Sequence, residues 1–190
     1  MNYITFDIET YSPSDLDKID TSEFRVTTAG AYFSWLDEYV AYMEKDIGDL
    51  IEMMEKADLI IGYNQLWFDL PVLQKYTKTN LLELPNYDIL IEFQKVAGFR
   101  SKLDDLCKAN FDNDVKTDSY EVYRHYHKQG KWLELIDYCM NDVRLTEQLF
   151  KKILNDGKIF YLDLHQKKEV TLAKPQFITK QHQAKDEAFF

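Results

Sequence analysis

Cysteine is scarce in this sequence, and its two cysteines stand alone. Cys107 and Cys139 form no CxxC pair, and no histidine lies near them at the spacing of a zinc ligand. These absences argue against a disulfide framework and against a structural zinc site. We therefore expect both cysteines to be reduced residues of the protein core.

Long apolar runs are missing as well. No segment approaches the roughly 20 consecutive apolar residues that a transmembrane helix needs. The opening segment MNYITFDIET also lacks the basic and apolar regions of a secretory signal. We therefore expect a cytosolic protein without a membrane partner.

Basic residues are few relative to acidic ones. The formal net charge is −10, with 33 aspartates and glutamates against 23 lysines and arginines. A protein that binds nucleic acid usually has a basic surface, so this charge alone argues against such a partner. The acidic excess lies in residues 1–94, however, whereas residues 95–190 are slightly basic. An acidic half that binds divalent cations can still approach phosphates, because bound metal ions reverse the local potential.

The length suits a single domain. The 190 residues, of which 45% are hydrophobic and 15% aromatic, provide for one substantial core but not for two. We expect one domain at residues 1–172, followed by a polar tail at residues 173–190.

Apolar periodicity predicts an alternation of strands and helices. Strands are predicted at residues 3–9, 25–36, 39–44 and 59–62, and a hairpin near the C-terminus at residues 158–164 and 169–172. Helices are predicted at residues 47–57, 69–76, 103–111, 119–129 and 132–154, while residues 87–93 begin either a strand or a helix. The pattern favours an α/β architecture, in which a mixed sheet has helices on its faces.

Paired carboxylates end the first predicted strand, in the segment FDIET. Asp7 and Glu9 are two residues apart, so on a strand both side chains point to the same side. Adjacent carboxylates repel each other unless a cation lies between them, and oxygen ligands suit Mg²⁺ or Mn²⁺. Taken alone, the pair is also compatible with a solvated strand end.

A third carboxylate follows the short buried strand at residues 59–62. Asp69 lies where the segment GYNQLWFD leads into the next predicted helix. This edge of a sheet is where α/β proteins place their clefts. Taken alone, Asp69 is better explained as a helix N-cap, with Asn64 as a turn residue.

The longest predicted helix contains Tyr138 and Asp142. Residues four apart share one face of a helix and differ by only about 6 Å of rise, so both side chains can reach one site. A half-buried tyrosine beside an exposed aspartate is the simpler interpretation of this pair alone. Asp137 lies on another face and is not a candidate.

Together, the three segments resemble the motifs of the DEDDy branch of DnaQ-like exonucleases, in the ribonuclease H-like superfamily. FDIET is similar to the first motif, GYNQLWFDLPVL to the second and YCMNDVRLT to the third, in its Y-x-x-x-D form. The second segment is also similar to proofreading exonuclease domains of family B DNA polymerases. The resemblance spans residues 1 to about 155 and implies a ribonuclease H-like mixed sheet flanked by helices, to which the C-terminal β-hairpin is an addition.

The resemblance implies a metal-dependent 3′–5′ exonuclease. Its expected substrate is the 3′ end of single-stranded DNA, from which it releases nucleoside 5′-monophosphates. Asp7, Glu9 and Asp142 would hold one Mg²⁺ or Mn²⁺ ion, and Asp7 would share a second ion with Asp69. Tyr138 would orient or deprotonate the attacking water.

Residues beside the motifs are candidates for contacts with the substrate: Thr10, Tyr11, Asn64, Trp67 and Phe68. Trp67 and Phe68 suit stacking on a terminal base, although we expect at least one of them to pack in the core. Some basic residues of the helical section are candidates for phosphate contacts, but most are expected to be solvated: Arg100, Lys102, Lys108, Arg124, Lys128 and Lys131. His125 and His127 are expected on the surface.

Two other functions stay open at this stage. An exoribonuclease would use the same site, because no motif here identifies a contact to the sugar 2′-hydroxyl that distinguishes RNA from DNA. A catalytically silent module that binds nucleic acid is disfavoured, since all four carboxylates and the tyrosine are present.

Overall fold

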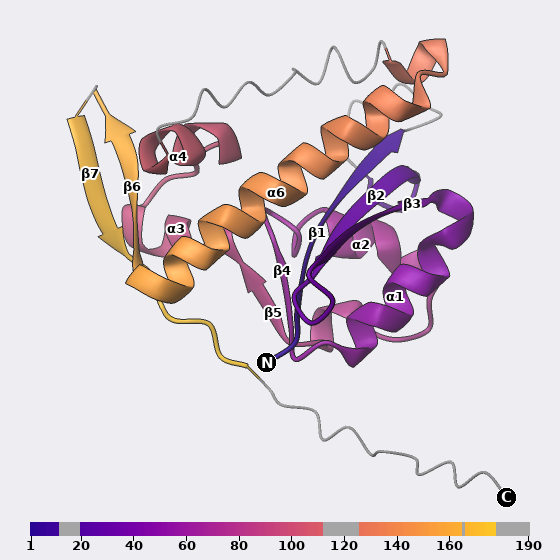
Figure 1. Cartoon of the computed structure of the whole chain (residues 1–190), viewed down its shortest axis with the longest axis horizontal. Helices are drawn as coiled ribbons and strands as arrows, with labels where there is room; N and C mark the ends of the chain where they lie inside the picture. The colour runs from indigo at the N-terminus through magenta and orange to yellow at the C-terminus, as the bar shows by residue number, and fades with distance from the viewer. Residues whose placement is uncertain (12–19, 112–125, 165, 178–190) are drawn as a thin grey trace, which may run out of the picture.

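A five-stranded mixed sheet forms the centre of the protein (Figure 1). The computed structural model describes residues 1–11, 20–111, 126–164 and 166–177. The strands are β1 (Tyr3–Tyr11), β2 (Arg25–Phe33), β3 (Glu38–Met43), β4 (Leu59–Gly62) and β5 (Asn86–Asp88), in the spatial order β3-β2-β1-β4-β5. The pairs β1–β2 and β2–β3 are antiparallel, whereas β1–β4 and β4–β5 are parallel.

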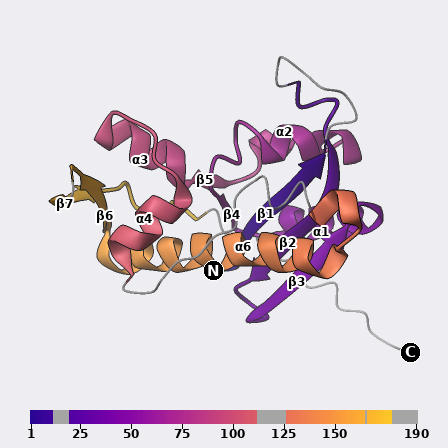
Figure 2. The same cartoon turned by 90° about the horizontal axis from the view of Figure 1, so that it is seen from above.

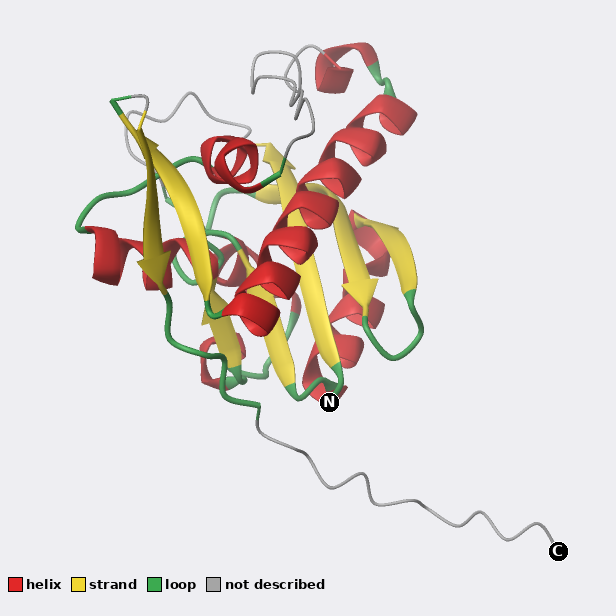
Figure 3. Cartoon of the chain, turned by 60° about the vertical axis from the view of Figure 1, so that its left-hand side comes forward, coloured by secondary structure: helices red, strands yellow, loops and turns green. Residues whose placement is uncertain are grey.

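Helices lie on both faces of this sheet, and a hairpin follows the last of them (Figure 3). The α-helices are α1 (Ile47–Lys56), α2 (Asp69–Leu73), α3 (Ile89–Ala97), α4 (Leu103–Asn110) and α6 (Trp132–Asp156). Short 3₁₀ turns are η1 (Glu44–Asp46), η2 (Gln74–Tyr76) and η3 (Leu81–Glu83), and the hairpin consists of β6 (Lys158–Asp163) and β7 (Gln166–Thr171). The predicted α/β class with a C-terminal hairpin is therefore confirmed.

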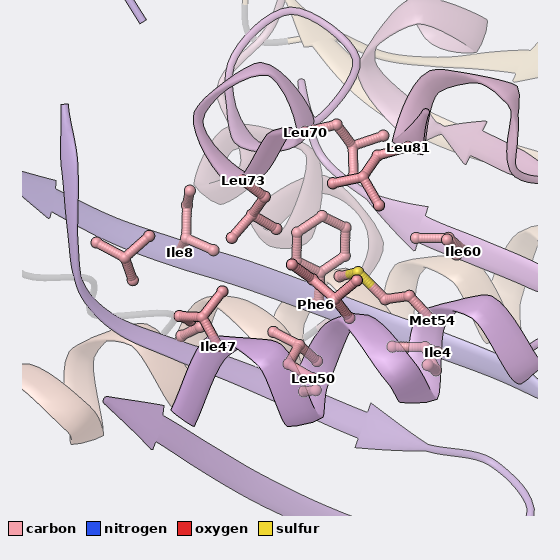
Figure 4. Close-up of a cluster of buried hydrophobic side chains, with 14 of the residues drawn as sticks. Ile4, Phe6, Ile8, Ile47, Leu50, Met54, Ile60, Leu70, Leu73 and Leu81 are labelled. Carbon is pink, nitrogen blue, oxygen red and sulfur yellow. The ribbon is translucent and has the colours of Figure 1, made fainter. Parts of the chain in front are cut away.

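The alternation of side chains along β1 divides the interior into two cores. Ile4, Phe6 and Ile8 point to one face, where they pack against α1 and α2 (Figure 4). Tyr3 points to the other face, where the core includes residues of α3, α4, α6 and the hairpin. Asp7 and Glu9 lie an even number of residues after Tyr3, so their side chains point to the same face of the sheet as Tyr3, the face that α6 covers.

Helix α6 crosses the sheet diagonally (Figure 1) and ends at Asp156, with Gly157 as the cap residue that follows it. Gly157 has a φ of 70°, a left-handed conformation that glycine adopts without strain at the end of a helix. Beyond it, the side-chain amide of Asn110 donates to the carbonyl of Phe160 at 2.8 Å and accepts from its N–H at 2.9 Å. These bonds hold strand β6 against α4.

Some predicted boundaries are wrong. Strand β2 ends at Phe33 rather than at Leu36, because the N–H groups of Leu36 and Asp37 both bond to the carbonyl of Phe33 and close a turn. Strand β7 begins at Gln166 rather than at Glu169, since Asp163 pairs directly with Gln166.

Two predicted segments fall largely outside the described residues. The helix predicted at residues 119–129 is described only from residue 126, and the polar tail only as far as residue 177. Within the described part of the chain, no helix combines the length and the apolar character that a membrane crossing requires.

Candidate metal centre

The two carboxylates of β1 lie at one edge of the sheet, on the face covered by α6. The strand is buried up to Phe6, and beyond it half-buried Asp7 and Glu9 alternate with buried Ile8 and Thr10. The period-2 prediction therefore places both carboxylates on the same side. A register shift between Glu9 and Thr10 follows immediately, as β-bulges often do beside functional sites.

Gly30 allows α6 to approach this part of the sheet closely. It pairs with Asp7 across β1 and β2. A Cβ atom at Gly30 would lie 2.7 Å from Met140 Sδ and 2.9 Å from Val143 Cγ2, both in α6. The absence of a side chain at this position therefore sets how near the helix lies to Asp7.

Asp142 completes a cluster of three carboxylates. One carboxylate oxygen each from Asp7, Glu9 and Asp142 can be chosen such that all three lie within 4.8 Å of one another. Buried Cys139 and Val143 fix the same stretch of α6 against the sheet. The side chains come from two segments more than 130 residues apart in the sequence, since Asp7 and Cys139 are separated by 132 residues.

Asp69 lies beside this cluster without joining it. The residue begins α2 and is only 5% exposed. Its Oδ1 accepts a hydrogen bond from the N–H of Ile8 at 3.3 Å. Its negative charge acts on Asp7, whose pKa is raised first by burial and next by Asp69. The alternative role of Asp69 as an N-cap is not observed, because Asp69 is the first helical residue and Phe68 precedes the helix without a capping bond.

The loop that carries Asp69 is held by Asp88, at the end of β5. The Asp88 carboxylate accepts from the N–H of Asn64 at 3.0 Å, of Leu66 at 3.1 Å and of Ile91 at 3.2 Å. The last of these bonds caps helix α3. One buried carboxylate thus fixes the loop before Asp69 and the start of the next helix.

Tyr138 lies one helical turn before Asp142 and is half-buried. Burial, followed by the charges of Glu9 and Asp142, raises the pKa of its phenol. The hydroxyl group therefore keeps its proton in the metal-free protein.

The carboxyl groups of the site all have raised pKa values. Burial and the charges of the neighbouring carboxylates raise the pKa of Asp7 and Glu9 well above the ordinary range. Burial raises the pKa of Asp69 to about 7, against the effect of the N–H groups of Asp69 and Ile8. Burial and then Asp104, which lies on α4, raise the pKa of Asp142 to about 7. A group of carboxylates that resists ionisation in this way has a strong electrostatic preference for a cation.

Cys139 also contacts the cluster. Its thiol lies 3.5 Å from the carbonyl oxygen and 3.8 Å from Oδ2 of Asp7. Burial and the charge of Asp7 raise the pKa of this thiol well above its usual value, so it donates its hydrogen as a neutral group. The prediction of buried, reduced cysteines agrees with the structure, in which Cys107 and Cys139 are both free and buried.

The candidate substrate residues fall into two groups. Trp67, two residues before Asp69 in the sequence, is 69% exposed, whereas Phe68 packs edge-on against Phe24 with ring centroids 5.3 Å apart. Asn64 takes a left-handed turn with a φ of 70°, and its Oδ1 accepts a 2.6 Å hydrogen bond from Arg100. Phe68 therefore packs in the core, as expected for at least one member of the aromatic pair, and Trp67 stays a candidate for stacking on a base.

Thr10 and Tyr11 lie at the end of β1. Thr10 is buried, and Tyr11 stacks on His127 with ring centroids 5.0 Å apart. Trp132 meets His127 edge-on at 6.0 Å, and the three rings line a cavity of about 490 Å³. His127 is therefore a half-buried residue that stacks on Tyr11, whereas His125 and Arg124 lie outside the described residues.

Sequence reasoning missed Gly30, Asp88 and Asp104. A glycine inside a strand signals close approach of another element, and an aspartate before an apolar run signals a helix cap. Both signals are present in the sequence. Nothing local indicates Asp104, because its influence on Asp142 depends on the packing of α4 beside α6.

The donor set fits a hard divalent cation. Every donor that the cluster offers is a carboxylate oxygen, and the chemistry of Mg²⁺ and Mn²⁺ favours such ligands. Positive charge between Asp7, Glu9 and Asp142 would remove the repulsion that raises their pKa values. The arrangement therefore matches a site for a divalent metal ion.

Comparisons with known proteins agree with this architecture. The structure is similar to that of the family B DNA polymerase from the hyperthermophilic archaeon Pyrobaculum calidifontis, with a TM-score of 0.62 and 19% sequence identity. The match covers 80% of this chain but 24% of the polymerase, so the chain spans about a quarter of that protein's length. At this identity the likeness concerns the fold alone. None of the curated proteins matches the sequence.

A family model described as the RNase_H superfamily matches residues 4–154. The matched range runs from β1 to the end of α6 and includes the three carboxylates of the cluster, Asp69 and Tyr138. The chain therefore belongs to the ribonuclease H superfamily.

Proposed function

We propose that this protein is a 3′–5′ exonuclease that depends on divalent metal ions and hydrolyses single-stranded DNA. The observation that carries the proposal is the convergence of Asp7, Glu9 and Asp142, with one oxygen of each within 4.8 Å of the others. Membership of a superfamily whose members are generally nucleases supports it. The motif resemblance supplies the direction of cleavage.

The carboxylates would divide between two ions. Asp7, Glu9 and Asp142 would hold one, and Asp69, which lies beside Asp7, would help to hold the other. When bound, divalent ions supply positive charge to the phosphate and make a water molecule easier to deprotonate.

Tyr138 orients the attacking water by donating or accepting a hydrogen bond through its phenol. The raised pKa of this phenol supports orientation over proton abstraction. The water oxygen forms a bond to phosphorus, and the bond from phosphorus to the O3′ atom of the penultimate nucleotide breaks. One proton of the water passes, through solvent, to that O3′ atom. The products are a nucleoside 5′-monophosphate and a strand with a new 3′-hydroxyl.

Trp67 supports a substrate with unpaired bases. Trp67 is exposed two residues before Asp69 in the sequence, and its indole ring offers a flat surface for the terminal base; stacking of this kind tolerates any base. A base within a duplex is already stacked on its neighbours. The same surface would accept RNA, so the sugar must be tested directly.

The test uses matched DNA and RNA strands labelled at the 5′ end, with Mg²⁺ or Mn²⁺. The expected result is a ladder that shortens steadily from the 3′ end of DNA, release of nucleoside 5′-monophosphates and complete arrest by EDTA. Faster digestion of RNA would make the protein an exoribonuclease. Intact strands under every metal, together with measurable binding, would indicate a silent nucleic-acid-binding module instead.

A further inference from the structure

A groove lies between the α3–α4 connection and strand β6. It has a volume of about 620 Å³, within the range of about 300–1,000 Å³ that is common for ligand sites. Figure 2 shows α3, α4 and the hairpin grouped at one end of the molecule. The Asn110–Phe160 bonds that hold β6 against α4 form part of the framework of this groove.

Positive charge is concentrated in the groove, although the protein as a whole is acidic. Arg100, Lys102 and Lys108 line it, with Asp105 as the one carboxylate among the lining residues. Within the described ranges, neither Lys102 nor Lys108 forms a salt bridge, unlike five other lysines, which pair with nearby carboxylates. The two ammonium groups are therefore available to an anion.

One wall of the groove is aromatic. Phe99 is 43% exposed, and its ring packs edge-on against Tyr161 at 5.3 Å. Both rings also contact Phe93, which is fully buried and anchors them. A rigid aromatic wall beside unpaired cations is the combination that binds a single strand, with phosphates on the cations and bases or sugars on the rings.

Two connections join the groove to the candidate metal centre. Arg100 lines the groove and also donates to Asn64, in the loop that leads to Asp69. Helix α4 provides the second connection. It carries Lys108, which lines the groove, and it packs against α6, the helix that carries Asp142.

From this arrangement we infer that the groove binds the sugar–phosphate backbone of the substrate strand, upstream of the nucleotide that is removed. Lys102 and Lys108 contact its phosphates, and Phe99 contacts a base or sugar. The inference rests on the proposed function for the identity of the ligand. It assigns to this chain a second nucleic-acid contact region, distinct from the carboxylates.

The test measures binding of a fluorescent DNA strand of about 12 nucleotides to protein that also carries Asp7→Asn, so that cleavage does not interfere. Lys102→Gln/Lys108→Gln removes the two cations of the groove. The matched control, Lys56→Gln/Lys78→Gln, removes two exposed lysines located at the end of α1 and after η2. Loss of two phosphate contacts should weaken binding by about 10- to 30-fold near 0.1 M salt and reduce the salt slope by about 1.4. The control should do neither.

A length series then locates the effect in the strand. With otherwise native protein, the groove variant should raise KM for the long strand and leave cleavage of a dinucleotide unchanged, because its one internucleotide phosphate occupies the metal centre. Equal loss on both substrates, or binding equal to that of the control, would overturn the inference. So would displacement of the strand by inorganic phosphate at comparable concentration, which would indicate a site for a single phosphate. If the protein cleaves no strand, yet the groove lysines still determine binding, the proposed nuclease function is wrong and the assignment of the groove as a binding site holds.

Discussion

The Asp69 carboxylate accepts a hydrogen bond from the backbone N–H of Ile8, at 3.3 Å, between the two carboxylates of β1. The bond places the second motif directly against the first. Because Asp69 is anchored to the strand that carries Asp7 and Glu9, its position relative to them depends little on the flexibility of its own loop. Strand β1 therefore positions three carboxylates of the candidate centre: it carries Asp7 and Glu9, and its backbone binds Asp69.

Asp7→Asn tests the repulsion within that centre. The amide retains the size of the carboxyl group but removes one charge, so DNA cleavage should fall by at least about 10²-fold. The metal-free protein should become more stable, because half-buried Asp7 lies among like charges that raise its pKa. Cleavage rates and urea denaturation measure the two effects. Asp49→Asn, an exposed change on α1, should affect neither; loss of stability in Asp7→Asn would contradict the account of the electrostatics.

Stability without metal should depend on pH in a defined direction. The folded-state pKa values of Asp69 and Asp142, about 7, exceed the ordinary value of about 3.9. The folded protein therefore retains protons that the unfolded chain has lost between about pH 4 and pH 7. Its free energy of unfolding should fall as pH rises through this window.

Denaturation at pH 5 and pH 8, with and without Mg²⁺, measures this dependence. Because ligands bind metal in their ionised form, Mg²⁺ should stabilise the protein much more at pH 8 than at pH 5. Asp142→Asn should make the metal-free dependence on pH shallower. Stability that is constant or rises between these pH values would show that the carboxylates are ionised without difficulty.

Tyr138→Phe separates chemistry from metal binding. Removal of the hydroxyl should lower kcat by about 10²-fold or more, since the group acts on the water that reacts. The affinity for Mn²⁺, measured by calorimetry, should hardly change because the phenol is not a ligand. Tyr42→Phe is the control, because Tyr42 packs against the core on the other face of the sheet. Equal loss of metal affinity and rate would make Tyr138 part of the metal site instead.

Gly30→Ala tests the close approach of α6. The new methyl group would meet the side chains of Met140 and Val143 at less than 3 Å, so these side chains or the helix that carries them must shift. We expect a loss of about 1–3 kcal/mol in unfolding free energy and weaker metal binding. A second change, Val143→Ala, should restore part of the stability and part of the metal binding, because it removes a side-chain atom that the new methyl group would meet.

Gly48→Ala provides a matched control for this substitution. Gly48 lies in α1, and nothing within 4 Å would meet its new methyl group. The change should stabilise the helix by about 0.5–1 kcal/mol. Equal behaviour of the two glycine variants would mean that Gly30 does not set the position of α6.

The local parts of the candidate centre were predictable from the sequence. The pairing of Asp7 with Glu9 follows from the period of a strand, and that of Tyr138 with Asp142 from the period of a helix. Neither period depends on the rest of the protein. The order of the three segments, through their resemblance to known motifs, supplied the expectation that they meet.

Contacts between distant elements were not predictable in the same way. Gly30 matters only because of the register that pairs it with Asp7 and because α6 packs on that pair. The contact of Tyr11 with His127 likewise joins β1 to a segment far along the chain. Strand ends shifted for a local reason, as backbone turns at Phe33 and Asp163 formed earlier than the apolar pattern indicates.

The most direct test of the central claim is the anomalous scattering of crystals grown with Mn²⁺. We predict a peak within about 2.6 Å of carboxylate oxygens of Asp7, Glu9 and Asp142, lost in Asp7→Asn crystals grown in the same way. Manganese bound elsewhere, with these three carboxylates holding none at concentrations that support cleavage, would contradict the claim that they form the catalytic metal site.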